Sequence, residues 1–308
     1  MYVKIGGIDQ WIQIGAENSD NPALLFLHGG PGGSSRSAAA AWRPWEKHFA
    51  VVHWDQRGAG QTFSKSGVER SGRLTVDRMI ADGIEVVEFL RSHLGKEKII
   101  LAGHSWGSFL GINIVKRRPD LFFAYVGTGQ LVNKQRNEEF NLERELAQAE
   151  AAKDSAALTA LRGIGPPPFN RETIDTLRHW ADRLADGMGD DVKMLPLPRS
   201  ELAAEDVEAF KQGRAFSRAQ LFEEFSSANL MSLGLTFDVP MFFFHGTADQ
   251  QTPIELAEQY FAAITAPKKA FIRLEGCHHF VVFNRPDLFL NELLAHVRPL
   301  AVICSTRE

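Results

Sequence analysis

The sequence predicts an α/β fold: a mostly parallel central sheet flanked by helices, with an all-helical cap inserted near the middle of the chain. Two observations support this prediction. In the first 130 residues and again after residue 233, short apolar runs that end in turn residues alternate with helical patterns. Such runs are typical of parallel strands that are buried on both faces. Over residues 131–233 no strand pattern is found, and stretches rich in Ala, Glu and Arg with a helical pattern take its place.

The first part of the chain contains three expected strands and two expected helices. The strands are the continuous apolar runs over residues 23–27, 49–54 and 98–102. Helices are expected over residues 75–94 and 106–118, because apolar residues there recur at steps of three and four. Strands that alternate with helices in this way indicate a parallel sheet.

The middle of the chain is expected to be helical throughout. Gly213 is expected to end one helix, and the capping-box pattern that starts at Ser217 is expected to begin the next. The expected helices cover residues 137–162, 172–187, 200–213 and 217–233. The α/β pattern then resumes with strands at 240–245 and 270–274 and helices at 253–263 and 286–297. The predicted domains are a core, residues 1–130 and 234–308, and a helical cap, residues 131–233.

The composition excludes several classes of function. Lysine and arginine total 34 against 38 aspartate and glutamate, a net charge of −4, so no binding to nucleic acid or to a membrane is expected. No apolar stretch approaches the roughly 18 residues of a membrane span, and no leader pattern begins the chain. Cys277 and Cys304 form no CxxC pair, so neither a metal site nor a disulfide is expected. These observations predict a cytoplasmic protein with no cofactor and leave its oligomeric state open.

A candidate nucleophile lies between the third expected strand and the helix that follows it. Residues 103–107 read Gly-His-Ser-Trp-Gly, which fits the G-x-S-x-G pattern of a sharp strand–turn–helix connection. Such a turn lifts the serine hydroxyl above the sheet edge and leaves room only for small residues two positions before and after it. Gly103 and Gly107 meet that demand. Because so short a pattern is common by chance, the assignment of Ser105 depends on its surroundings.

A serine nucleophile needs a base, and the base needs an acid to orient it. The strand expected over residues 240–245 leads into Asp249, and the strand over 270–274 leads into His278 and His279. Each of these residues is expected at the carboxyl end of a parallel strand, where open α/β sheets bind their ligands. The sequence therefore predicts that Ser105, Asp249 and one of the two histidines act together.

A glycine-rich loop supplies a fourth part of the candidate site. Residues 28–33 read His-Gly-Gly-Pro-Gly-Gly directly after the first expected strand. Glycines let backbone N–H groups come close to a reacting oxygen. With the N–H of Trp106, the N–H of Gly30 is expected to form an oxyanion hole. A phosphate-binding loop is the alternative, but no G-K-[ST] or G-x-G-x-x-G spacing is present, which excludes the common nucleotide-binding patterns.

These motifs resemble the α/β-hydrolase superfamily and, within it, the proline iminopeptidase group. The resemblance rests on HGGPGG at 28–33, WDQRGAGQT at 54–62 and SWGS at 105–108, together with the chain order Ser, Asp, His. It implies a serine hydrolase without a cofactor that cleaves a small molecule or short peptide through an acyl-enzyme. In the peptidases the residue removed is N-terminal and usually proline. The usual superfamily ending also implies His279 as the base, with His278 as the alternative.

The predicted cap departs from the peptidase pattern. Those enzymes hold the free amine of the substrate with cap glutamates, one of them in a W-x-x-W-E-like stretch, whereas residues 179–183 here read His-Trp-Ala-Asp-Arg. Glu223 and Glu224 are the remaining candidates for that role, and Trp180 is a candidate pocket wall. Three functions follow: a proline iminopeptidase-like aminopeptidase, a carboxylesterase acting on small esters, and a non-catalytic small-molecule binding protein on the same fold.

Overall fold

The computed structural model describes residues 1–184 and 204–302. Cys304 and the ends of two expected helices, 185–187 and 200–203, lie outside these ranges. One eight-stranded sheet has the order β1-β2-β4-β3-β5-β6-β7-β8. The strands are β1 Tyr2–Ile5, β2 Ile8–Gly15, β3 Ala23–Leu27, β4 Ala50–Asp55, β5 Ile99–His104, β6 Phe122–Thr128, β7 Met241–Gly246 and β8 Lys269–Leu274. The pairs β1–β2 and β2–β4 are antiparallel, and every other pair in the sheet is parallel.

The predicted mostly parallel sheet is confirmed. All five expected strands are present as β3, β4, β5, β7 and β8, and each begins within one residue of its predicted start. The structure adds β1, β2 and β6, for which no strand was predicted. In β2 only alternate positions such as Gln10 and Ile12 are fully buried, so it lacks the continuous apolar run that marks a strand covered on both faces.

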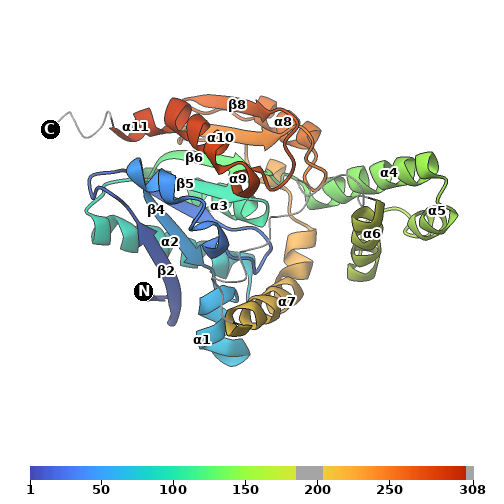
Figure 1. The fold of residues 1–308 in the computed structure, drawn as a ribbon, viewed down its shortest axis with the longest axis horizontal. Coiled ribbons are helices and arrows are strands. Elements are labelled where there is room, and N and C mark those ends of the chain that lie inside the picture. The colour runs from blue at the N-terminus through green and yellow to red at the C-terminus, as the bar shows by residue number, and fades with distance from the viewer. Residues whose placement is uncertain (185–203, 303–308) are drawn as a thin grey trace.

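Two helical layers cover the two faces of the sheet (Figure 1). On β3, Leu25 packs into a core with Ile80 of one helix, while Leu24 and Phe26 pack into a second core that contains Trp42. The helices are α1 Gly60–Ser71, α2 Val76–Leu94, α3 Trp106–Arg117, α8 Ile254–Ala263, α9 Val281–Asn284, α10 Pro286–Glu292 and α11 Arg298–Val302. Among the described residues, no helix has both the length and the apolar character that crossing a bilayer requires.

Local sequence determines where α2 begins and ends. The Thr75 hydroxyl accepts a hydrogen bond from the Arg78 N–H at 3.1 Å, which satisfies one of the free donors of the first turn. At the other end Gly95 has φ 63°, the left-handed conformation that ends many helices and that glycine adopts without strain. The helix predicted over residues 75–94 is confirmed to within one residue.

The chain between β6 and β7 is helical wherever the structure describes a long element. It contains α4 Lys134–Ala152, α5 Ser155–Arg162, α6 Arg171–Leu184 and α7 Ala204–Ser226. Figure 1 shows α4, α5 and α6 extending away from the sheet, whereas α7 lies along α1. The two ends of the insertion are joined, because Lys134 N–H donates to the carbonyl of Ala228 and Leu230 N–H to that of Val132. The exact domain boundaries stay a prediction.

The two helices expected around residues 213–217 are one helix, α7, and the prediction of a break was wrong. Gly213 is not a terminus but a point of close approach: a Cβ there would lie 2.8 Å from the carbonyl oxygen of Gly58 and 3.2 Å from Phe63 Cβ. Ser217 does not cap a helix either. Its hydroxyl donates to the Gly58 carbonyl at 2.8 Å, so both residues serve the contact between α7 and the core.

We predict that Gly213→Val destabilises the protein while Gln212→Val does not. A valine side chain at 213 must displace the backbone of Gly58, and overpacking of this kind typically costs about 1–3 kcal/mol. Gln212 is exposed and carries the same β-branched substitution on the same helix, so it controls for helix propensity. Urea unfolding of the two variants measures the difference. Equal midpoints would contradict the close packing of α7 on α1.

Candidate active site

The candidate nucleophile lies in a strained turn between β5 and α3. Ser105 has φ 54°, a region that residues other than glycine rarely adopt. A Cβ at Gly103 would collide with the Gly107 carbonyl, and one at Gly107 with the Leu27 carbonyl, so both positions require glycine. The Ser105 N–H donates to the Thr128 carbonyl of β6 at 3.1 Å, which fixes the turn to the neighbouring strand. The side chain of Ser105 remains partly exposed.

Asp249 and His279 form a buried pair at the ends of β7 and β8. The Nδ1 atom of His279 lies 2.8 Å from Asp249 Oδ2 and 3.0 Å from Oδ1. The carboxylate is held from behind, because it accepts hydrogen bonds from the backbone N–H of Gln251 and Thr252 and from the Thr252 hydroxyl at 2.8–2.9 Å. An imidazole bonded through Nδ1 to a carboxylate has its tautomer fixed and its Nε2 available as a base.

His278 is placed differently from its neighbour. Its Nδ1 atom lies 2.9 Å from the carbonyl oxygen of Ala248. The His278 imidazole thus bonds to the backbone, whereas the Asp249 carboxylate bonds to His279. Of the two histidines left open by the residues alone, the structure therefore pairs only His279 with the acid.

His104 joins the candidate nucleophile to the candidate base. It precedes Ser105 in the chain, its Nε2–H donates to the carbonyl of His279 at 2.9 Å, and the two imidazole rings lie 4.6 Å apart. Among the described residues, Ser105 Oγ and the His279 ring form no hydrogen bond with each other. Such bonds are often long before substrate binds. The structure thus brings Ser105, His279 and Asp249 to adjoining positions.

The glycine-rich loop lies against the serine turn. A Cβ at Gly29 would be 3.2 Å from Ser105 Cβ, so only glycine lets the loop come this close. Gly30 has φ 134°, again a glycine conformation. Trp106 is the first residue of α3, and the N–H of a first helical residue has no acceptor within its helix. The two expected oxyanion donors therefore lie on either side of the same turn.

Gln56 links the two segments that carry these donors, a role that the sequence motif did not reveal. Its side-chain NH₂ donates to the His28 carbonyl at 3.2 Å, and its backbone N–H donates to His28 Nε2 at 3.2 Å. The same side chain accepts a hydrogen bond from Trp106 Nε1 at 3.0 Å. One fully buried amide thus links the glycine-rich loop to the start of α3. The position of Gln56 directly after a buried strand, inside the DQRG stretch, was the available signal.

Burial keeps two of these histidines neutral. It lowers the pKa of His28 to about 4 and that of His104 to about 3, because a cation would lose its hydration inside the protein. Asp249, in contrast, keeps its charge. Burial raises its pKa, but the imidazoles of His279 and His245 and the Thr252 N–H outweigh burial, so the pKa of Asp249 lies below its usual range. Within the described ranges, no three His, Cys, Asp or Glu side chains converge as metal ligands.

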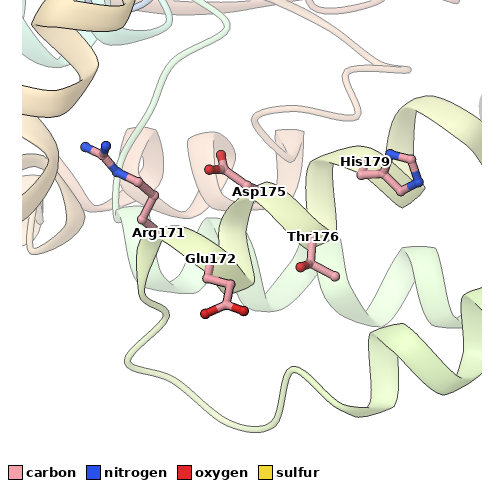
Figure 2. Close-up of a pocket in the computed structure, with 5 residues that line it drawn as sticks. All are labelled: Arg171, Glu172, Asp175, Thr176 and His179. Atoms are coloured by element: carbon pink, nitrogen blue, oxygen red, sulfur yellow. The ribbon is translucent and has the colours of Figure 1, made fainter.

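A cavity of about 230 Å³ opens beside the glycine-rich loop, between the core and the inserted helices. Its lining residues are Gly30, Pro31, Lys134, Arg171, Ile174, Asp175, Arg178, Ala215, Arg218, Leu221, Phe222, Phe225 and Ser226. A second, open depression of about 570 Å³ is lined by α6 alone (Figure 2). The first of these places residues of α4, α6 and α7 next to the expected oxyanion donor Gly30.

The three cap residues suggested by the sequence lie elsewhere. Glu224 accepts a hydrogen bond from the backbone N–H of Val76 at 2.7 Å and so stabilises the start of α2. Glu223 is exposed on α7. Trp180 packs against the small core of the inserted helices, and Arg183 lies 5.3 Å from its ring. None of the three lines the cavity beside Gly30.

Known proteins are similar to this chain over most of its length. Residues 19–286 match the family model described as "Serine aminopeptidase, S33". The chain is 33% identical over 305 residues to the "Probable aminopeptidase YbaC" of Bacillus subtilis, a match that spans 96% of this chain and 95% of that protein. The chain belongs to the S33 serine aminopeptidase family. It is accordingly an enzyme of the serine hydrolase type, with the α/β-hydrolase fold.

Other relatives match a shorter part of the chain. A proline iminopeptidase of Neisseria gonorrhoeae is 33% identical over 122 residues, which is 39% of this chain and 36% of that protein. Solved structures share the fold at low identity. The esterase RhEst1 from Rhodococcus sp. ECU1013 is 18% identical with a TM-score of 0.62, over 97% of this chain and 98% of that one. An epoxide hydrolase from Bacillus megaterium is 18% identical with a TM-score of 0.60, over 96% and 99%.

We predict that this S33 enzyme loses stability as the pH falls from 6.5 toward 4. His28, His53 and His104 have pKa values lowered to about 4, 4 and 3 by burial, whereas unfolded histidine titrates near 6.5. In this pH window the unfolded chain binds more protons than the folded one, so their stabilising contribution is full above 6.5 and declines below it. Each such histidine adds a slope of up to about 1.4 kcal/mol per pH unit.

The slope can be assigned with one variant and one control. His53→Asn removes a buried histidine and should flatten the dependence of the free energy of unfolding on pH. His93→Gln replaces an exposed histidine and should leave that slope as it is. Urea unfolding at several pH values measures both. A slope that is the same in all three proteins would contradict the burial of a neutral His53.

Proposed function

We propose that the chain hydrolyses small amides or esters through an acyl-enzyme formed on Ser105. His279, oriented by Asp249, accepts the proton of the Ser105 hydroxyl as the oxygen attacks the substrate carbonyl. The protonated imidazole then gives this proton to the leaving amine or alcohol. Water, deprotonated by His279, attacks the acyl-enzyme, and the proton returns to Ser105 Oγ as the acid leaves.

The observation that carries the proposal is the contact between Asp249 and His279 beside the strained turn of Ser105. A buried carboxylate whose pKa is held below its usual range stays ionised, and it stabilises the imidazolium that forms during the reaction. The close approach of Gly29 to Ser105 supports a role for Gly30 and Trp106 as oxyanion donors. These groups come from four segments that are far apart in the sequence.

Two substrate classes compete within this chemistry. The relatives support an aminopeptidase of the proline iminopeptidase type, which must bind a free ammonium group near the reacting carbonyl. A carboxylesterase is the second candidate, and one observation favours it: Glu223 and Glu224 lie outside the cavity beside Gly30. Turnover of L-proline 4-nitroanilide against that of 4-nitrophenyl butyrate, on one preparation, separates the two.

A non-catalytic binding protein on the same fold is the alternative of another class. It requires a serine that does not react with acylating or phosphonylating reagents. A fluorophosphonate probe tests this directly, because it labels a serine only where a base and an oxyanion hole activate it. Rapid labelling supports the hydrolase.

We predict that Ser105→Ala abolishes fluorophosphonate labelling and lowers kcat for 4-nitrophenyl butyrate by roughly 1000-fold or more. The substitution removes the attacking oxygen. Thermal unfolding should occur no lower than in the wild-type enzyme, because the backbone strain at φ 54° is unrelated to the hydroxyl. Labelling that persists in Ser105→Ala would show that another residue is the nucleophile.

The two adjacent histidines provide a matched pair of variants. We predict that His279→Ala lowers kcat by roughly 1000-fold, since the base is lost, and that His278→Ala changes it by less than about fivefold. The His278 side chain lies in hydrogen-bond distance of the Ala248 carbonyl, whereas Asp249 is paired with His279, so removal of the His278 imidazole leaves the Asp249 pair intact. Steady-state kinetics on one ester measures both. The reverse order of the two effects would overturn the assignment of the base.

A further inference from the structure

Cationic side chains dominate the cavity beside Gly30. Four of its lining residues are lysine or arginine, namely Lys134, Arg171, Arg178 and Arg218, and Asp175 is the one carboxylate among the described lining residues. They come from three helices, α4, α6 and α7. Figure 2 shows that Arg171 and Asp175 extend from the same side of α6. A cavity of this composition attracts anions.

Arg171 of α6 and Arg218 of α7 both line the cavity and are linked across the two helices. Arg171 lies 5.2 Å from the ring of Phe222 and donates to the carbonyl of Arg218 at 3.5 Å, so its position is fixed by α7. Burial, and next the neighbouring guanidinium groups of Arg178 and Arg214, lower the pKa of Arg218. Cations that line one cavity repel one another, and a bound anion relieves that repulsion.

Lys134 brings the cationic lining close to the reacting groups. It is almost fully buried and is the first residue of α4. Its ammonium lies 5.9 Å from the ring centre of Phe225, and the Phe225 ring in turn lies 4.9 Å from that of Trp106. The cavity therefore adjoins one proposed oxyanion donor directly, because Gly30 lines it, and Phe225 of its wall packs on the side chain of Trp106.

The carboxylates nearby are engaged with cations. Asp175 lies 3.5 Å from Arg218, and the carboxylate of Glu138 forms an ion pair with Lys134 one turn along α4. A free ammonium entering the cavity would have to compete with these cations for Asp175. A carboxylate would meet guanidinium groups, which bind it in a bidentate manner.

We propose that this cavity binds a carboxylate of the substrate, so that the enzyme acts on small esters or amides that carry a free carboxylate. The inference rests on the proposed function and adds the chemical class of its substrate. A volume of about 230 Å³ accommodates only a small group beside the reacting carbonyl. The C-terminal carboxylate of a dipeptide and the acid group of a half-ester both fit this description.

Matched substrate pairs test the inference in the intact enzyme. One pair carries the charge in the leaving part, 4-butyryloxybenzoate against 4-butyryloxybenzamide. The other carries it in the acyl part, 4-nitrophenyl hydrogen adipate against 4-nitrophenyl hexanoate. We expect kcat/KM to favour the charged member by at least fivefold in one pair, and this preference to shrink when KCl is raised from 50 to 500 mM. A preference below fivefold in both pairs overturns the inference.

Variants locate the source of the preference. The double variant Arg171→Gln/Arg218→Gln should lower the ratio of kcat/KM values between charged and neutral members by at least fivefold. Arg162→Gln removes an exposed cation of α5 that pairs with Glu150, outside the cavity, and should retain the wild-type ratio. If the double variant keeps the wild-type ratio, the inference is wrong. Should that variant fail to fold, the salt dependence in the wild-type enzyme decides alone.

The failure of this inference differs from the failure of the proposed function. If Ser105 is not labelled by the fluorophosphonate, both the proposed function and the inference are wrong. If Ser105 is labelled but kcat/KM shows no preference for the charged substrates, only the inference is wrong. If the enzyme is labelled but hydrolyses neither pair, the test is how strongly a bound compound slows fluorophosphonate labelling. We expect 4-hydroxybenzoate to slow labelling at least fivefold more than 4-hydroxybenzamide at the same concentration. Equal slowing by the two compounds overturns the inference.

Discussion

The backbone turn at Ser105 is the constraint on which the rest of the site depends. A positive φ in a sparsely populated region costs a non-glycine residue about 1–3 kcal/mol and persists only where its surroundings hold it. Here Gly103, Gly107 and Gly29 remove every Cβ that would block the close approach of β5, α3 and the glycine-rich loop. The hydrogen bond from Ser105 N–H to Thr128 then fixes the turn to β6. The strain is therefore maintained by the sheet itself, which positions the hydroxyl independently of the inserted helices.

Around this turn the protein uses buried neutral histidines as hydrogen-bonding groups and keeps the carboxylate of Asp249 charged. His28 and His104 are uncharged because burial lowers their pKa values, so they act as hydrogen-bonding groups that hold the loop and the His279 backbone. Asp249 stays ionised, since His279, His245 and the Thr252 N–H compensate for its lost hydration. Its carboxylate lies 2.8 Å from Nδ1 of His279, and this contact fixes the tautomer of that imidazole.

Local sequence could predict five of the eight strands in the sheet and the candidate residues, whereas β1, β2, β6 and the long-range contacts were not predicted. The run at β3 and the ends of α2 at Thr75 and Gly95 follow from neighbouring residues alone. Gly213 was misread because its requirement for glycine comes from Gly58, which is 155 positions earlier in the chain. The roles of Gln56 and of the cationic lining depend in the same way on tertiary packing, so composition and spacing do not reveal them.

The inserted helices and the core are expected to affect different kinetic constants of a charged substrate. In the proposed mechanism the core supplies the groups that act on developing charge, and Asp249 and His279 among them are buried. The cations of α6 are exposed, and unit charges about 4 Å apart gain only about 1 kcal/mol in a watery environment. A carboxylate that does not take part in the reaction keeps its charge throughout, so these cations stabilise the bound substrate and the transition state alike. Uniform stabilisation of this kind lowers KM and leaves kcat to the buried groups around Ser105.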